Sequence, residues 1–146
     1  MIESHSEELL DKYPAFYYAS TYGKSPETSD FKAPETSTGW YMPSAGNLWD
    51  IVRNLGEETR LDEFQNSNSI YLSLGRSTSA ILNNINQRMA QIPRSQKFSY
   101  GAICTSSECN ETNILTINLL GNLAKNLEID KTSKMDSYSV RCVLAF

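Results

Sequence analysis

Few side chains in this sequence can serve as nucleophiles, general bases or metal ligands. His5 is the only histidine, and it lies in a polar leading segment where we expect it at the surface. A Ser-His-Asp or Cys-His arrangement within one chain would need that residue. A zinc site needs about four ligands, usually cysteine or histidine at short spacings, and Cys109 and Cys142 are too far apart in sequence to offer such a pair. We therefore predict no catalytic residue and no metal site.

The three cysteines leave two interpretations open. Cys104 and Cys109 could form a local disulfide, and the odd total leaves at least one thiol unpaired within the chain. Alternatively, Cys104, Cys109 and Cys142 are all small, partly buried thiols. A reactive cysteine needs a lowered pKa and an exposed sulfur, and the sequence indicates neither.

Paired carboxylates could in principle act as acid and base. Such pairs have no fixed spacing, so Glu57–Glu58 and Asp62–Glu63 are candidates only in that sense. A further acidic group lacks the spacing of a calcium-binding EF-hand loop and is interpreted as solvated loop charge: Glu128, Asp130 and Asp136. The sequence contains neither a Walker phosphate-binding loop nor a Gly-x-Gly-x-x-Gly motif. No cofactor is predicted.

The composition is that of one folded domain. The chain has 146 residues, of which 40% are apolar and 21% charged, and its net charge is -4. This charge argues against the basic footprint of a nucleic-acid-binding protein. No apolar run approaches the roughly 18 residues of a membrane helix, and the polar, acidic start from Met1 to Asp11 does not resemble a signal peptide. Either the protein is cytoplasmic or a leader has been removed.

Helical signals dominate the first two thirds of the chain. Pro14 suits the first position of a helix over 14–22. Ser44 is a good N-cap for a helix over 44–56, where apolar residues recur at helical spacing. A third apolar stripe predicts a helix over 79–92.

Two polar segments surround these helices. Ser4 and Glu7 have the spacing of a capping box, which predicts a short helical stretch near the N-terminus. Residues 24–39, rich in Ser, Thr, Pro and Glu, are predicted to form a loop. The tyrosines just before this loop either pack a helix onto a sheet or form an exposed aromatic surface: Tyr17, Tyr18 and Tyr22.

Strand signals follow the third helix. We predict strands over 98–105, 114–119, 123–129 and 140–146. The last is apolar except for Arg141, a pattern typical of a central strand covered on both faces. Residues 57–69 are predicted to be a polar connection anchored by Leu61 and Phe64. Helices followed by antiparallel strands indicate the α+β class.

Two segments together resemble a known family. The first is Gly39-Trp40-Tyr41-Met42-Pro43-Ser44-Ala45-Gly46 and the apolar helix after it. The second runs from Thr105-Ser106-Ser107-Glu108 through Lys131 or Lys134 to Val140-Arg141-Cys142-Val143-Leu144-Ala145-Phe146. This order of motifs is similar to the C-terminal domain of Bacteroidales surface lipoproteins and fimbrillin-like proteins, in the major paralogous domain group. The family's motifs usually carry Trp where Cys104 and Leu115 stand here.

The resemblance implies a C-type-lectin-like fold, with two to three helices packed on a small twisted antiparallel sheet with long loops. It implies a polar lead-in over 1–12 and a single domain over 13–146, located at the cell surface or outer membrane. In this fold Trp40 is expected to be a core anchor and Ser44 the helix cap. Arg141 is expected to pair with a carboxylate such as Glu108 or with backbone carbonyls, or alternatively to contact a ligand.

The family context predicts a non-catalytic, adhesin-like recognition domain. Its ligand, a glycan or a protein, would bind through loops between the C-terminal strands. Six residues there supply hydrogen-bonding groups: Glu108, Asn110, Asn113, Asn118, Asn122 and Asn126. The alternative interpretation is that asparagine simply populates turns. No nucleic acid and no direct membrane insertion is expected.

Other functions stay open. The Asn-rich stretch before Val140 also suits a protein varied by a diversity-generating retroelement. The chain could be an assembly module of a surface appendage, whose final strand pairs with the edge of another chain. If the chain is a fragment, the strand that normally opens this fold would lie before Met1, which would leave an exposed edge. Last, a formylglycine-generating type of enzyme would need Cys104 and Cys109 as a redox pair.

Overall fold

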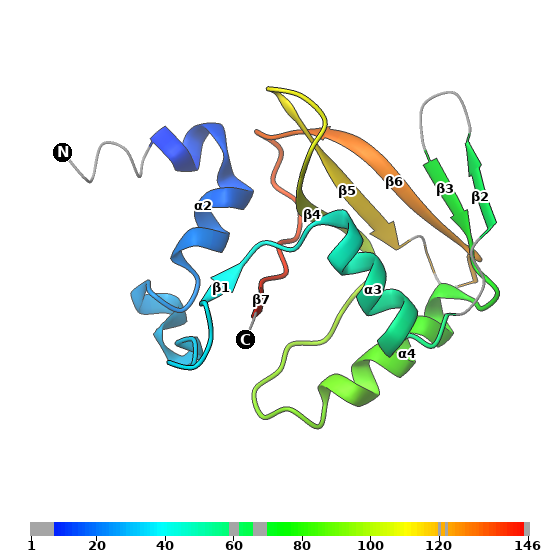
Figure 1. Ribbon diagram of the computed structural model, residues 1–146, viewed down its shortest axis with the longest axis horizontal. Coiled ribbons are helices and arrows are strands. Elements are labelled where there is room, and N and C mark those ends of the chain that lie inside the picture. The colour runs from blue at the N-terminus through cyan, green and yellow to red at the C-terminus, as the bar shows by residue number, and fades with distance from the viewer. Residues whose placement is uncertain (1–7, 59–61, 66–69, 120, 122, 145–146) are drawn as a thin grey trace.

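The computed structural model describes residues 8–58, 62–65, 70–119, 121 and 123–144, and these form an α+β fold, as predicted (Figure 1). Residues 8–12 are helical. The elements that follow are α2 (Pro14–Thr21), the 3-10 helix η1 (Pro26–Phe31), β1 (Trp40–Tyr41), α3 (Ala45–Leu55), β2 (Asp62–Gln65), β3 (Ile70–Ser73), α4 (Thr78–Met89), β4 (Gly101–Glu108), β5 (Asn113–Leu119), β6 (Asn126–Ser133) and β7 (Val143–Leu144).

The main sheet has five antiparallel strands in the order β2-β3-β6-β5-β4. Strands β4, β5 and β6 correspond to three predicted strands. The hairpin of β2 and β3 lies partly in the segment that we predicted to be a connection, so that prediction is wrong. The anchors expected there, Leu61 and the side chain of Phe64, lie outside the described part of the structure.

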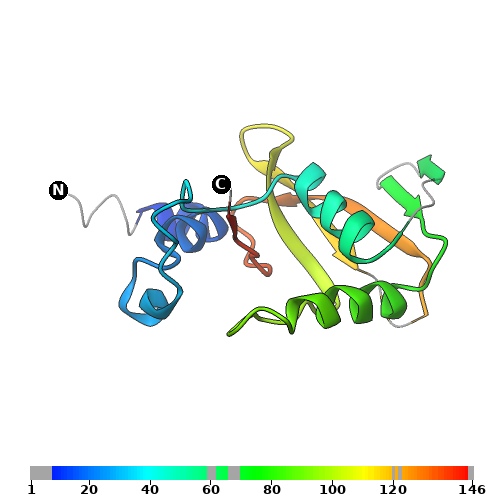
Figure 2. The same ribbon diagram turned by 60° about the horizontal axis from the view of Figure 1, so that its bottom comes forward.

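The two faces of the main sheet pack against different helices. Because side chains alternate along a strand, Ile103 and Ile117 point to the same face of the sheet. Helices α3 and α4 cover this face, and Ile85 of α4 packs in the same core cluster. Figures 1 and 2 show these two helices side by side along the sheet. On the other face, Cys104 and Ile114 pack against α2 and Met42. The sheet is therefore the layer that joins all three long helices.

Local signals in the sequence predicted the helix starts correctly. Ser44 caps α3 in a capping box: its hydroxyl accepts the N–H of Asn47 at 3.1 Å, and the Asn47 side chain accepts the N–H of Ser44 at 3.1 Å. Pro14 stands at the start of α2. The helix predicted over 79–92 begins slightly earlier, after the cap Ser77, and ends at Met89, whose carbonyl accepts hydrogen bonds from the turn that follows.

The last segment is not the central strand that we predicted. Only Val143–Leu144 form a strand, β7, and it pairs with β1 in a separate two-stranded sheet, with Trp40 opposite Leu144. Residues 140–144 are only half-buried, and residues 145–146 lie outside the described part. Just before this segment, the carbonyl of Ser139 accepts the N–H of Cys104 at 2.8 Å at the outer edge of β4, and Val140 and Cys142 pack against the cluster that contains Cys104. The final strand thus finds its partner at Trp40–Tyr41, within the chain.

Trp40 and Arg141 are packed, but not where we expected. Trp40 is half-buried outside both hydrophobic clusters; its indole N–H donates to the carbonyl of Phe31 at 2.6 Å and its ring meets Tyr22 edge-on. It therefore holds the N-terminal loop in place. The Arg141 guanidinium donates to the carbonyl of Gln96 and lies 4.4 Å from the ring centroid of Phe98. The backbone alternative is confirmed, and the pairing with Glu108 is wrong.

We expect two buried threonines, Thr105 of β4 and Thr116 of β5, to respond in opposite ways to the same substitution. The hydroxyl of Thr105 donates to the carbonyl of Leu115 at 2.7 Å, whereas that of Thr116 has no hydrogen-bond partner among the described residues. We expect Thr105→Val to lower the free energy of unfolding by about 2 kcal/mol and Thr116→Val to raise it by about 1 kcal/mol, measured by urea denaturation. Equal losses would contradict the difference between the two hydroxyls.

Candidate ligand-binding surface

The predicted ligand-binding residues lie at opposite ends of the sheet. Glu108, Asn110 and Asn113 lie at the turn between β4 and β5, whereas Asn118 and Asn126 lie near the turn between β5 and β6. The sixth residue, Asn122, is outside the described part. The prediction of a single surface that contains all of these residues is therefore wrong. The residues at the β4–β5 turn form the larger of the two groups.

Asn110 fixes the shape of the β4–β5 turn. Its side-chain oxygen accepts the N–H groups of Thr112 at 2.9 Å and Asn113 at 2.8 Å, and also the Thr112 hydroxyl at 3.1 Å. The backbone N–H of Cys109 closes the turn on the carbonyl of Asn113 at 2.9 Å. This is the turn role that asparagine often has. The oxygen of Asn110 is thus used within the protein.

Lys134 connects the turn to two other segments. Its side chain is buried, and its ammonium lies 3.2 Å from a carboxylate oxygen of Glu108 and 5.9 Å from the ring centroid of Tyr13. Its backbone N–H donates to the carbonyl of Thr112 at 2.9 Å. A buried ammonium is stable only where such groups compensate for lost hydration. Lys134 therefore ties the turn to the segment after β6 and to α2.

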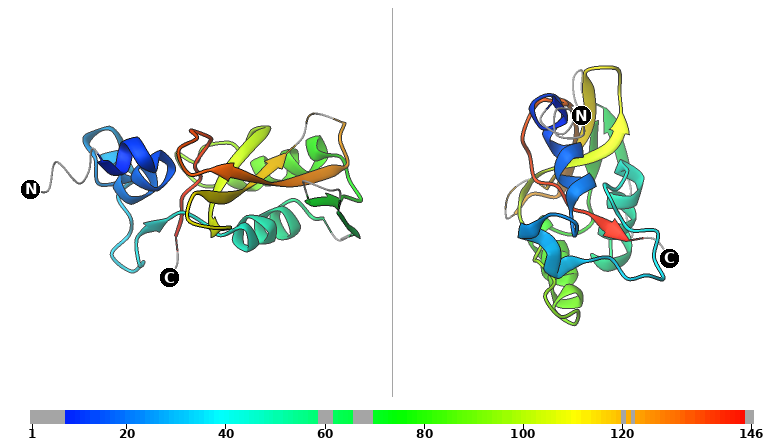
Figure 3. Two further views of the ribbon diagram at one scale, coloured as in Figure 1. Left: turned by 90° about the horizontal axis from the view of Figure 1, so that it is seen from above. Right: turned by 90° about the vertical axis from the view of Figure 1, so that its left-hand side faces the viewer.

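We call the set Tyr13, Glu108, Asn110, Thr112, Asn113 and Lys134 the hairpin surface. The β4–β5 turn projects beyond the helices next to the end of β6, as Figure 1 and the right panel of Figure 3 show. Its outer groups are exposed: the carboxylate of Glu108, the amide of Asn110, the hydroxyl of Thr112 and part of the Tyr13 ring. They can accept and donate hydrogen bonds to a ligand. Sequence reasoning missed Tyr13, and it treated Lys134 only as a motif position.

The thiols of Cys104 and Cys142 do not have the properties of reactive cysteines. Burial raises the pKa of Cys104, and it raises that of Cys142 to about 11, so both are protonated at neutral pH. All three cysteines lie in the described part of the chain and are free. Cys104 and Cys109 are five positions apart along an extended segment, roughly 16 Å, which is beyond the reach of a disulfide. The local bridge is therefore not formed.

Of the two candidate carboxylate pairs, Glu57–Glu58 does not form an acid–base site. Glu57 is exposed and pairs with Arg88 at 2.6 Å, whereas Glu58 is buried and accepts backbone N–H groups. Asp62 and Glu63 lie in β2, and their side chains are not described. Among the described residues, no group of three or more His, Cys, Asp or Glu is placed to hold a metal ion.

No helix in the described residues is both long enough and apolar enough to span a bilayer.

We compared the chain with protein-family models, with curated proteins and with solved structures, and none of the three comparisons gave a match.

Proposed function

We propose that this chain is a non-catalytic recognition domain with a C-type-lectin-like fold that binds a glycan or a protein ligand through the hairpin surface. The observation that carries this proposal is the gathering of Glu108, Asn110 and Asn113 on a turn whose shape is set by hydrogen bonds and by the buried Lys134. As part of the proposal, the domain acts at the cell surface or on a fimbria.

The architecture is compatible with the proposed fold. Helices α3 and α4 pack on one face of a small antiparallel sheet, and long irregular segments connect the elements. The assembly alternative rests on a final strand that pairs with another chain. In the structure, one edge of the final strand β7 pairs with β1 of the same chain.

The hairpin surface suits binding because its groups are ordered before a ligand arrives. Asn110 and Lys134 hold the turn from within, so little further conformational entropy is lost on association. One oxygen of Glu108 is held by Lys134, and the carboxylate is still more than half exposed. A hydrogen bond from a ligand to a charged group contributes about 1.5–3 kcal/mol.

Hairpin variants should therefore lose ligand binding. We expect a ligand found on glycan or protein arrays to bind Glu108→Gln about tenfold or more weakly, because one charge-assisted hydrogen bond is lost. Asn113→Ala should also bind less tightly, by a smaller factor, because its amide is neutral and also donates to Asn110 and to Thr112 within the turn, each at 3.1 Å. Dissociation constants of wild type and variants, measured by calorimetry, check this expectation.

Asn118→Ala and Asn126→Ala are the matched controls, because both residues lie near the opposite end of the sheet. We expect them to change the dissociation constant less than twofold, within the range of about 0.4 kcal/mol. The proposed surface would be contradicted if no ligand on the arrays bound the protein, or if the control variants lost as much affinity as the hairpin variants.

A further inference from the structure

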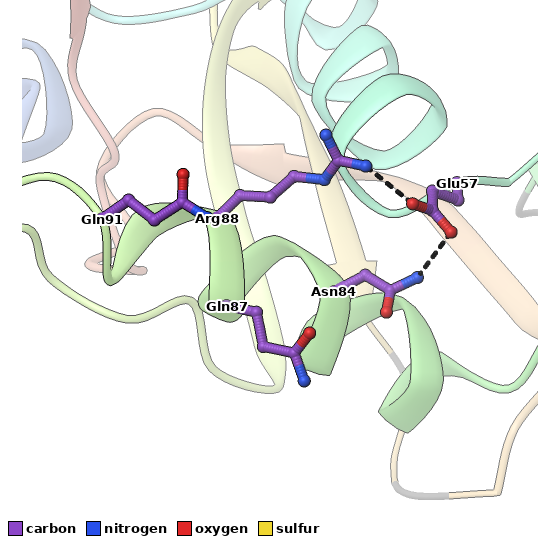
Figure 4. A pocket seen from close by; sticks show the side chains of 5 residues that line it. All are labelled: Glu57, Asn84, Gln87, Arg88 and Gln91. Carbon is purple, nitrogen blue, oxygen red and sulfur yellow. Dashed lines mark hydrogen bonds and ion pairs between the residues drawn. The ribbon is translucent and has the colours of Figure 1, made fainter.

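A polar pocket lies far along the molecule from the hairpin surface, between the end of α3 and the outer side of α4. It measures about 280 Å³ and is lined by Glu57, Asn84, Gln87, Arg88 and Gln91 (Figure 4). The last four residues recur at helical spacing along α4 and the turn after it, so they share one side of that helix. Every residue that lines the pocket carries a hydrogen-bonding side chain.

The carboxylate of Glu57 is held in position by neighbours from two segments. Arg88 lies 2.6 Å from one oxygen, and Asn84 and Arg76 each lie 3.4 Å from the other. Figure 4 shows the side chains of Arg88 and Asn84 reaching Glu57 from α4. The wall of the pocket is thus ordered in advance, which reduces the entropic cost of binding.

The backbone at Glu57 adds a second observation. Its φ of 57° lies in the left-handed region that glycine adopts readily and other residues only at a cost. Gly56, one position earlier, has an ordinary helical backbone conformation. Glycine is needed at this position because a Cβ there would lie 2.3 Å from the carbonyl oxygen of Val52. The left-handed Glu57 ends α3: the N–H of Glu58 donates to the carbonyl of Arg53 at 3.1 Å, the pattern of a common helix C-cap, and the cap fixes where the Glu57 side chain leaves the backbone.

The remaining side chains are available to a ligand. The amides of Gln87 and Gln91 make no side-chain hydrogen bond with any described residue, and each offers two donors and an acceptor. The charges at the wall, in contrast, are already paired with one another. This combination fits a neutral molecule with several hydroxyl groups, each able to donate and to accept.

We propose that this pocket binds a single neutral saccharide ring. Its volume of about 280 Å³ lies just below the range of about 300–1,000 Å³ for small-molecule sites, which matches a ligand of one ring. The amides of Gln87 and Gln91 contact hydroxyl groups of the ring, and the carboxylate of Glu57 accepts hydrogen bonds from two adjacent hydroxyl groups. The inference is independent of the hairpin surface.

The test is a titration of the ¹⁵N-labelled protein with a panel of free monosaccharides: glucose, galactose, mannose, fucose and N-acetylglucosamine. We expect at least one of them to shift the side-chain amides of Gln87 and Gln91 with millimolar affinity. Gln87→Ala should weaken that binding about three- to tenfold, as expected for one neutral hydrogen bond.

Asn83→Ala is the matched control, because Asn83 is exposed on α4 and does not line the pocket. It should bind as the wild type does, and so should Glu108→Gln, which separates this site from the hairpin surface. The proposal is overturned if no sugar shifts the amides, if Asn83→Ala weakens binding equally, or if inorganic phosphate binds there and no sugar does.

Discussion

Glu58→Ala is expected to lower the free energy of unfolding by about 3 kcal/mol, which is a large part of the stability of a domain of this size. Glu58 is 1% exposed, and its two carboxylate oxygens accept the backbone N–H groups of Gly75 and Arg76, each at 3.1 Å. These bonds join the end of α3 to the turn before α4. Removal of the carboxylate leaves two N–H groups in this turn without their acceptor.

Urea denaturation followed by circular dichroism measures this effect, with two variants for comparison. Glu58→Gln keeps the shape and one acceptor oxygen, so we expect roughly half of the loss. Glu57→Gln changes the exposed neighbour, whose ion pairs at the surface contribute little, and should cost less than about 1 kcal/mol. If Glu58→Ala loses no more than Glu57→Gln, the buried carboxylate does not hold this turn.

Elements governed by local interactions could be predicted from the sequence. Ser44 caps α3 through a residue three positions away, and Pro14 starts α2 through its own fixed φ. Strands β4 to β6 follow from side-chain alternation, which burial on one face imposes. In each case the deciding contact lies within a few residues of the signal.

Elements governed by distant contacts could not be predicted. The apolar run from Val140 is equally compatible with a central strand and with the short β7, and its pairing with Trp40 decides between them. Arg141 is held by Gln96, which no spacing relates to it. Lys134 is only a motif position in the sequence, and its contacts with Glu108 and Tyr13 join residues that are far apart along the chain.

The division of the predicted ligand residues was within reach of the sequence. Successive turns of antiparallel neighbouring strands lie at opposite ends of a sheet. Asn110 and Asn113 flank one such turn, and Asn118 and Asn126 flank the next. The three predicted strands therefore implied two separate groups. Why Asn110 supports the turn from within, in contrast, depends on its rotamer and needed the structure.

Gly56→Ala is expected to cost about 3 kcal/mol for a purely steric reason. The backbone of Gly56, with φ of -80° and ψ of -11°, is one that alanine adopts without strain. A Cβ there would lie 2.3 Å from the carbonyl oxygen of Val52 and 2.5 Å from Cγ2 of Ile81. Helix α3 must therefore move away from α4 and loosen the core that both helices share, as in other overpacked interiors.

Gly46→Ala provides the control, because it makes the same change in the first turn of the same helix. The nearest atom to its added Cβ is the Ser44 hydroxyl oxygen at 3.7 Å, which is ordinary contact. Alanine is the better helix former, so this variant should gain about 0.5–1 kcal/mol. Opposite shifts of the urea midpoint are expected. If Gly56→Ala is as stable as Gly46→Ala, then α3 and α4 do not approach each other as closely as the described packing requires, and the pocket between them loses the wall that Glu57 forms.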